Sequence, residues 1–228
     1  MGWPLRNSPG GLVYHVLNRG NGRLAIFHKD RDYQACLDVL AEAQKHVPGV
    51  HLLSYCLMPN HWQLVLWPTA DGELSDFMHW LSLTHTQRWH AHYQNRGGGH
   101  LYQGRFKSFP VETDEHFLTV CRYVERNAVR ANLVTKAEQW CWCSLAQRLG
   151  LGAPMVPELS DGPLPWPDNW RTTVNRPLTE AEIEAVRRSV ERGQPFGSEF
   201  WIKQAAGQLG LASTLKPRGR PKKAEKGS

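Results

Sequence analysis

The chain has 228 residues, of which 41% are hydrophobic, enough for one well-buried core and an additional segment. It contains no apolar run of membrane-spanning length and no apolar signal-like stretch after Met1, so we expect a cytoplasmic protein without membrane association. Five cysteines without a CxxC pair predict reduced thiols rather than a disulfide framework or a zinc ribbon.

The net charge of +6 is concentrated at the C-terminal end. Residues 216–228 contain six Lys or Arg and one Glu, a net charge of +5, which leaves about +1 for the rest of the chain. A basic tail on a near-neutral body favours attraction to a polyanion that tolerates many sequences. The alternative is a disordered tail that serves only solubility.

The predicted elements follow the order β-α-β-β-α-β, with one more helix appended. They are a strand at 12–19, a helix at 30–46, strands at 50–57 and 61–67, a helix at 74–93, a strand at 105–112 and a helix from 115 to about 132. The tight link Met58-Pro59-Asn60 predicts that the two middle strands pair as a hairpin. This order is the split βαβ arrangement of a ferredoxin-like α+β fold.

The composition changes after Leu149, where prolines and glycines become frequent. We therefore divide the chain into a first domain at 1–150, a proline-rich linker at 151–178, a helical segment at 179–214 and a basic, disordered tail at 215–228. Two short helices are expected near 179–192 and 198–209. Trp166 and Trp170 are expected to pack the linker back onto the body.

Four polar residues form a candidate site. Tyr123 and Asn127 are four residues apart, which places both on one face of a helix. His61 and Gln63 alternate onto one face of the strand at 61–67. Imidazole and amide oxygens suit Mg²⁺ or Mn²⁺, and a tyrosine hydroxyl beside such an ion is a candidate nucleophile. By itself, a single histidine in a hairpin is more commonly structural.

Longer segments sharpen this interpretation. The runs at 56–68, 101–107 and 123–134 occur in the order and at the spacing of the REP-associated tyrosine transposases, which the chain resembles over about residues 10–150. These proteins are HUH single-tyrosine transposases. The resemblance implies an enzyme that cuts and rejoins single-stranded DNA at hairpin-forming repeats through a 5′-phosphotyrosine. The sequence leaves open whether the protein is a monomer or a homodimer. It assigns the nucleophile to Tyr123, a metal ligand to His61 and an accessory ligand to Asn127.

Gln63 departs from the motif, which has a second histidine at this position. An amide oxygen is a poorer donor than imidazole for Mn²⁺, whereas octahedral Mg²⁺ accepts amide oxygens. Two alternatives to an active nuclease therefore remain. One is a catalytically silent protein that binds DNA hairpins, and the other is a ferredoxin-like RNA-binding or regulatory module in which Tyr123 is a packing residue.

Basic side chains around the site are candidate DNA contacts: Arg19, Arg23, Arg105 and Lys107. Arg122, Arg126 and Arg130 are further candidates, although Arg122 and Arg126 also fit a solvated helix face. His15 is either a neighbour of the metal or a core histidine. In the tail, Arg218-Gly-Arg220 resembles an AT-hook, whose arginines enter the minor groove of A·T-rich DNA, and plain electrostatic tethering is the alternative.

Overall fold

A four-stranded antiparallel sheet forms the centre of the protein. The computed structural model describes residues 8–95, 97, 99–153 and 157–216. The sheet order is β2-β3-β1-β4, with strands β1 (Val13–Arg19), β2 (Val50–Met58), β3 (His61–Pro68) and β4 (Lys107–Val111). β2 and β3 pair as the predicted hairpin. The ferredoxin-like α+β fold is therefore confirmed.

Eight α-helices are present among the described residues: α1 (Asp30–His46), α2 (Glu73–His92), α3 (Glu115–Glu125), α4 (Asn127–Arg130), α5 (Ser144–Arg148), α6 (Trp170–Asn175), α7 (Glu180–Arg192) and α8 (Glu199–Gln208). Short 3₁₀ turns lie at Asn21–Arg23, Ala137–Gln139 and Ala212–Leu215. The sequence did not predict α5 and α6, because helices of five or six residues depend on tertiary contacts rather than on their own propensity.

The sheet has a hydrophobic core on each face, as the alternation of side chains predicts. Trp62, Leu64 and Leu66 pack into the core that includes α1 and α2. Val65 belongs to the other core, together with Val120 of α3. Because alternate residues share a face, the odd-numbered positions of β3 face the side of the sheet that α3 covers.

The helix that follows β4 is interrupted where the sequence predicted one continuous helix. α3 ends at Glu125 and α4 begins at Asn127, with Arg126 at φ −85° and ψ 4° between them. The Arg126 amide bonds the carbonyl of Arg122 and also that of Val124, which tightens the turn. The side chain of Arg126 donates to the carbonyl of Asn175, 2.7 Å away, so tertiary contact accompanies the break.

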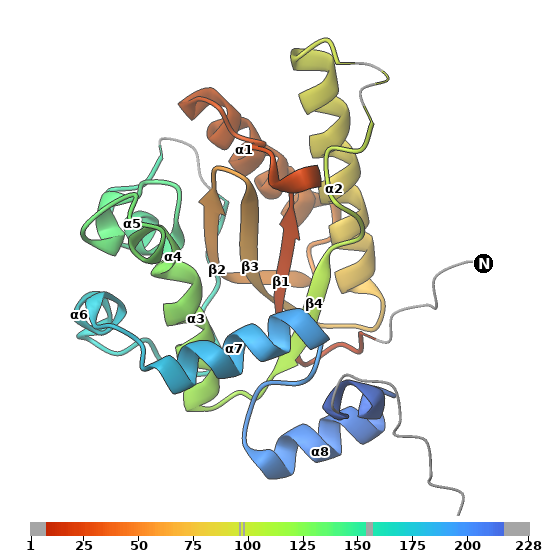
Figure 1. Ribbon diagram of the computed structural model, residues 1–228, viewed down its shortest axis with the longest axis vertical. Helices are drawn as coiled ribbons and strands as arrows, with labels where there is room; N and C mark the ends of the chain where they lie inside the picture. The colour runs from red at the N-terminus through yellow and green to blue at the C-terminus, as the bar shows by residue number, and fades with distance from the viewer. Residues whose placement is uncertain (1–7, 96, 98, 154–156, 217–228) are drawn as a thin grey trace, which may run out of the picture.

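Helix α7 packs against the edge of the sheet. Figure 1 shows α7 crossing beside β4 and α3, with α8 beyond it. Between them, Phe196 exchanges backbone hydrogen bonds of 2.9 Å with Pro110 and Glu112. α7 and α8 begin after the capping side chains of Thr179 and Ser198, which explains why the sequence located both helices well.

The linker contacts the body through its two tryptophans, as expected. The ring centroid of Trp166 lies 5.7 Å from that of Phe117 and 5.1 Å from that of Trp170.

The described part of the chain contains no helix with the length and apolar character needed to cross a membrane.

Candidate active site

His61 is the centre of the polar cluster. Its Nδ1 lies 2.7 Å from Asn60 Oδ1, an acceptor, which places the ring hydrogen on Nδ1 and the lone pair on Nε2. Burial, with smaller contributions from Arg19, Arg130 and His15, lowers the pKa of His61 to about 4. The ring is therefore neutral near pH 7, the state that a metal ligand requires.

Gln63 and Asn127 converge on this lone pair from two different elements. Asn127 Nδ2 lies 3.0 Å and Gln63 Nε2 3.3 Å from His61 Nε2. The structure thus brings together the three predicted ligand residues. In this arrangement the amide nitrogens, and not the oxygens, face the imidazole.

His15 is the neighbour of the cluster that the sequence left open. It is fully buried on β1, and its Nε2 lies 2.9 Å from Gln63 Oε1. Its ring also meets the Tyr123 ring edge-on, with centroids 6.3 Å apart. His15 is thus both a core residue and a contact of the candidate site.

Arg130 connects Tyr123 with Asn127. Its Nη1 donates to the Tyr123 carbonyl at 2.9 Å, and its Nη2 donates to Asn127 Oδ1 at 2.7 Å. The guanidinium carbon lies 3.8 Å from the centre of the Tyr123 ring, a cation–π contact. This one side chain therefore fixes the relative positions of the two residues on either side of the helix break.

Tyr123 lines a cleft of about 680 Å³ with a basic wall. Basic side chains from β1, β4, the preceding loop and α7 share it: Arg19, Lys107, Arg105 and Arg187. Three predicted DNA contacts therefore lie with Tyr123 in one cleft. Arg23 is exposed at the turn after β1 and does not line this cleft, and Arg218 and Arg220 lie outside the described residues.

Arg122 and Arg126 have structural partners. Arg122 Nη2 donates to the carbonyls of Arg176 and Pro177, at 2.9 and 2.7 Å. Arg126 is held by Asn175 in the same way. These guanidinium groups satisfy carbonyls that follow α6 or form its last turn, so they do more than face the solvent, and a phosphate contact by either stays a prediction.

Two features of the site gave no clear sequence signal. Arg187 reaches the cleft from α7, which is distant in sequence from Tyr123. Glu125 is fully buried and accepts hydrogen bonds from Ser144 Oγ at 2.6 Å and Trp170 Nε1 at 2.8 Å. Burial raises its pKa. In the sequence, the burial of Glu125 was indicated only by its position beside Val124 on the apolar face of the helix.

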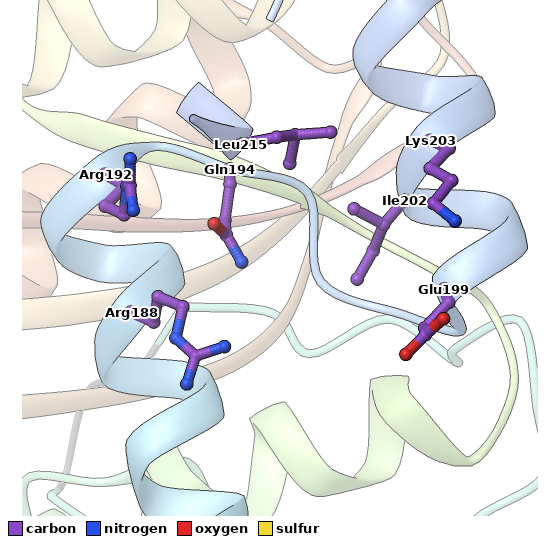
Figure 2. A pocket seen from close by; sticks show the side chains of 7 residues that line it. All are labelled: Arg188, Arg192, Gln194, Glu199, Ile202, Lys203 and Leu215. Carbon is purple, nitrogen blue, oxygen red and sulfur yellow. The ribbon is translucent and has the colours of Figure 1, made fainter. Parts of the chain in front are cut away.

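A second pocket, of about 390 Å³, lies between α7 and α8. Figure 2 shows Arg188 and Arg192 of α7 on one side of it, with Lys203 and the carboxylate of Glu199, both of α8, on the other. None of the predicted site residues lines it. The Tyr123 cleft therefore remains the candidate active site.

One cluster of His, Cys, Asp or Glu side chains among the described residues has metal-ligating spacing. It consists of Glu112, Asp114 and His116, whose ligand atoms lie within 4.8 Å of one another. Asp114 caps α3 by accepting from the His116 amide, and Glu112 accepts from the Ser198 amide at the start of α8. Helix capping accounts for both carboxylates.

The split βαβ sheet thus carries a tyrosine in a cleft with a basic wall. The profile of the family described as IS200-like transposases matches residues 10–127, more than half of the chain. The chain belongs to this family.

Two solved structures are similar to this chain. A REP-associated tyrosine transposase bound to a REP hairpin has 14% identity and a TM-score of 0.49, and the match covers 71% of this chain and 94% of that one. A candidate transposase from Deinococcus radiodurans R1 has 20% identity and a TM-score of 0.39, with 55% and 95% covered. No curated protein matches the chain.

The basic wall of the cleft leads to a first prediction. We expect Arg187→Ala to weaken binding of single-stranded DNA and to reduce the slope of log affinity against log salt by about 0.7, the value for one lost phosphate contact. Arg188→Ala, at the next residue but outside the Tyr123 cleft, is the matched control. Fluorescence anisotropy at several salt concentrations measures both variants. Equal slopes for the two variants would contradict a phosphate contact by Arg187.

Proposed function

We propose that the protein is a metal-dependent endonuclease and strand transferase that acts on hairpin-forming repeats in single-stranded DNA. The supporting observation is that Tyr123 lines a basic cleft while Arg130 ties it to Asn127, which contacts His61. Membership of the IS200-like transposases supports a reaction on DNA. The hairpin and REP-type target come from the resemblance of the sequence motifs.

In the proposed reaction, the Tyr123 hydroxyl oxygen attacks the scissile phosphorus as its proton passes to solvent. A bond forms between this oxygen and phosphorus, and the bond from phosphorus to the 3′-oxygen breaks. The 3′-oxygen takes up a proton, and the 5′ end stays attached as a phosphotyrosine. A second 3′-hydroxyl then attacks this phosphorus, which rejoins the strands and restores Tyr123.

The cleft residues have roles in binding and charge stabilisation. Arg19, Arg105 and Lys107 neutralise phosphates and hold the strand along the cleft. Arg130 lies over the tyrosine ring, where its positive charge stabilises the negative charge that develops on the attacked phosphate. These contacts do not depend on base identity, so they fix the position of the backbone rather than the sequence.

The polar cluster suits a divalent ion of the kind that transposases generally use. The neutral His61 imidazole supplies a nitrogen, and Gln63 and Asn127 supply amide groups whose oxygens suit Mg²⁺. Such an ion would polarise the scissile phosphate and stabilise the leaving 3′-oxygen. The three residues carry no negative charge, so we expect weak binding that a DNA phosphate strengthens.

Gln63 provides a prediction about metal preference. We expect Gln63→His to lower the Mn²⁺ concentration needed for half-maximal cleavage several-fold, because imidazole is the better donor for this ion. Cleavage titrations with Mn²⁺ and Mg²⁺ measure the effect. Unchanged dependence on both ions in a folded variant would exclude Gln63 from the coordination shell.

A second candidate function is a protein that binds the same hairpins without cutting them. The orientation of both amides favours it, because their nitrogens donate to His61 and occupy the lone pair that a metal needs. Incubation of a labelled hairpin oligonucleotide with Mg²⁺ or Mn²⁺ separates the two functions. A nicked strand with covalently attached protein supports the enzyme, whereas hairpin binding without either product supports the silent binder.

A further inference from the structure

Gln63 and Asn127 both direct their amide nitrogen toward His61. The amide oxygen of each residue has a hydrogen-bond partner elsewhere in the cluster. Gln63 Oε1 lies 2.9 Å from His15 Nε2. Asn127 Oδ1 lies 2.7 Å from Arg130 Nη2. Oxygens are the atoms that Mg²⁺ prefers, so both preferred ligand atoms already have hydrogen-bond partners.

Arg130 and His15, the partners of the two amide oxygens, differ in the amide orientations that they allow. A guanidinium has only donors, so Arg130 is compatible with the oxygen of Asn127 and not with its amide nitrogen. A neutral imidazole has one donor and one acceptor, and it exchanges them by changing its tautomer. His15 is therefore compatible with either end of the Gln63 amide, whereas Asn127 is locked.

The surroundings of His15 define its tautomer in the structure. Burial lowers its pKa to about 4, so the ring is neutral. Gln63 Oε1 only accepts hydrogen bonds, so the ring hydrogen lies on Nε2. Nδ1 is buried with no partner among the described residues, and a buried acceptor without a partner is less unfavourable than a buried N–H without one.

We propose that His15 is a positioning residue that determines, through the tautomer of its ring, which end of the Gln63 amide faces His61. With hydrogen on Nε2, His15 keeps the Gln63 oxygen away from His61. With hydrogen on Nδ1, its Nε2 accepts from the Gln63 amide group, and the oxygen turns toward the His61 lone pair. One proton leaves Nε2 and one binds Nδ1, so the net charge is unchanged. The proposal rests on the proposed role of Gln63 as a metal ligand.

NMR of the full chain with ¹⁵N-labelled histidine tests the proposal, because long-range ¹H–¹⁵N couplings distinguish the two tautomers. In the metal-free protein we expect hydrogen on His15 Nε2. Titration with Mg²⁺ alone should shift the population to the Nδ1 form as the His61 signals change. Hydrogen on Nδ1 without metal, or on Nε2 while the His61 signals respond, would overturn the proposal.

Two variants separate this inference from the proposed function. Gln63→Glu keeps one oxygen for His15 and offers another to the ion, so its His15 should retain the Nε2 hydrogen with and without Mg²⁺. Gln63→Leu removes the acceptor, and its His15 should populate both tautomers. If Mg²⁺ does not change the His61 signals, the proposed metal site is wrong. The Gln63→Leu variant then tests the role of His15 separately, because a pure Nε2 tautomer in that variant would contradict control of the tautomer by Gln63.

Discussion

Tyr123→Phe is expected to reduce strand cleavage by more than about a thousandfold, because it removes the only oxygen that forms the covalent bond to phosphorus. DNA binding should stay within about twofold, since the ring, its cation–π contact with Arg130 and the basic wall of the cleft are retained. Denaturing gels that resolve nicked DNA and covalent adducts measure the reaction, and anisotropy measures binding.

A matched control removes a tyrosine hydroxyl elsewhere. Tyr93→Phe deletes the hydroxyl that donates to Asp32 at 2.6 Å, in a part of the chain that does not line the cleft. Its cleavage rate should equal that of the wild type. Nicking by Tyr123→Phe at the wild-type rate would show that another group, or water, is the nucleophile.

Acidification is expected to destabilise the fold strongly between pH 6.5 and pH 4. Burial lowers the pKa of His15, His61 and His85 from 6.5 to about 4. The unfolded chain therefore binds more protons in this range, so the stability present above pH 6.5 is lost as the pH falls toward 4. Each histidine contributes about 2 kcal/mol to the loss at pH 4.5, a large share of a typical free energy of unfolding.

His85 allows this effect to be isolated, because it lies outside the candidate site and its Nδ1 is 2.6 Å from the Tyr102 hydroxyl. His85→Gln retains an acceptor for that hydroxyl and does not titrate. Urea unfolding at pH 7.5, 5.5 and 4.5 should show a pH dependence about one third weaker in this variant. Glu125 acts in the opposite direction, because its raised pKa favours the folded state at low pH. An unchanged pH dependence would contradict a neutral buried His85.

Strong local patterns explain why the sequence predicted most of the fold. The hydrophobic spacing over residues 30–46 predicted the bounds at which α1 is found, Asp30–His46. The alternation around His61 predicted the two faces of β3, and α7 and α8 lie close to the helices expected near 179–192 and 198–209. α5 and α6 were missed, because their few residues carry too little periodicity to be recognised.

For the site, the sequence by itself determined which residues share a face. The period of two puts His61 and Gln63 together on β3, and the helical spacing brings Asn127 near Tyr123 despite the break at Arg126. These relations follow from backbone geometry over a few residues, so no tertiary information is needed to infer them.

Only the tertiary structure decided what these residues contact. His15 reaches Gln63 through the pairing of β1 with β3, and Arg187 reaches the Tyr123 cleft because α7 packs beside α3. The direction of the Gln63 amide depends on His15, 48 positions away in sequence. Hydrogen-bond orientation is set by partners from distant segments, and no local periodicity encodes those partners.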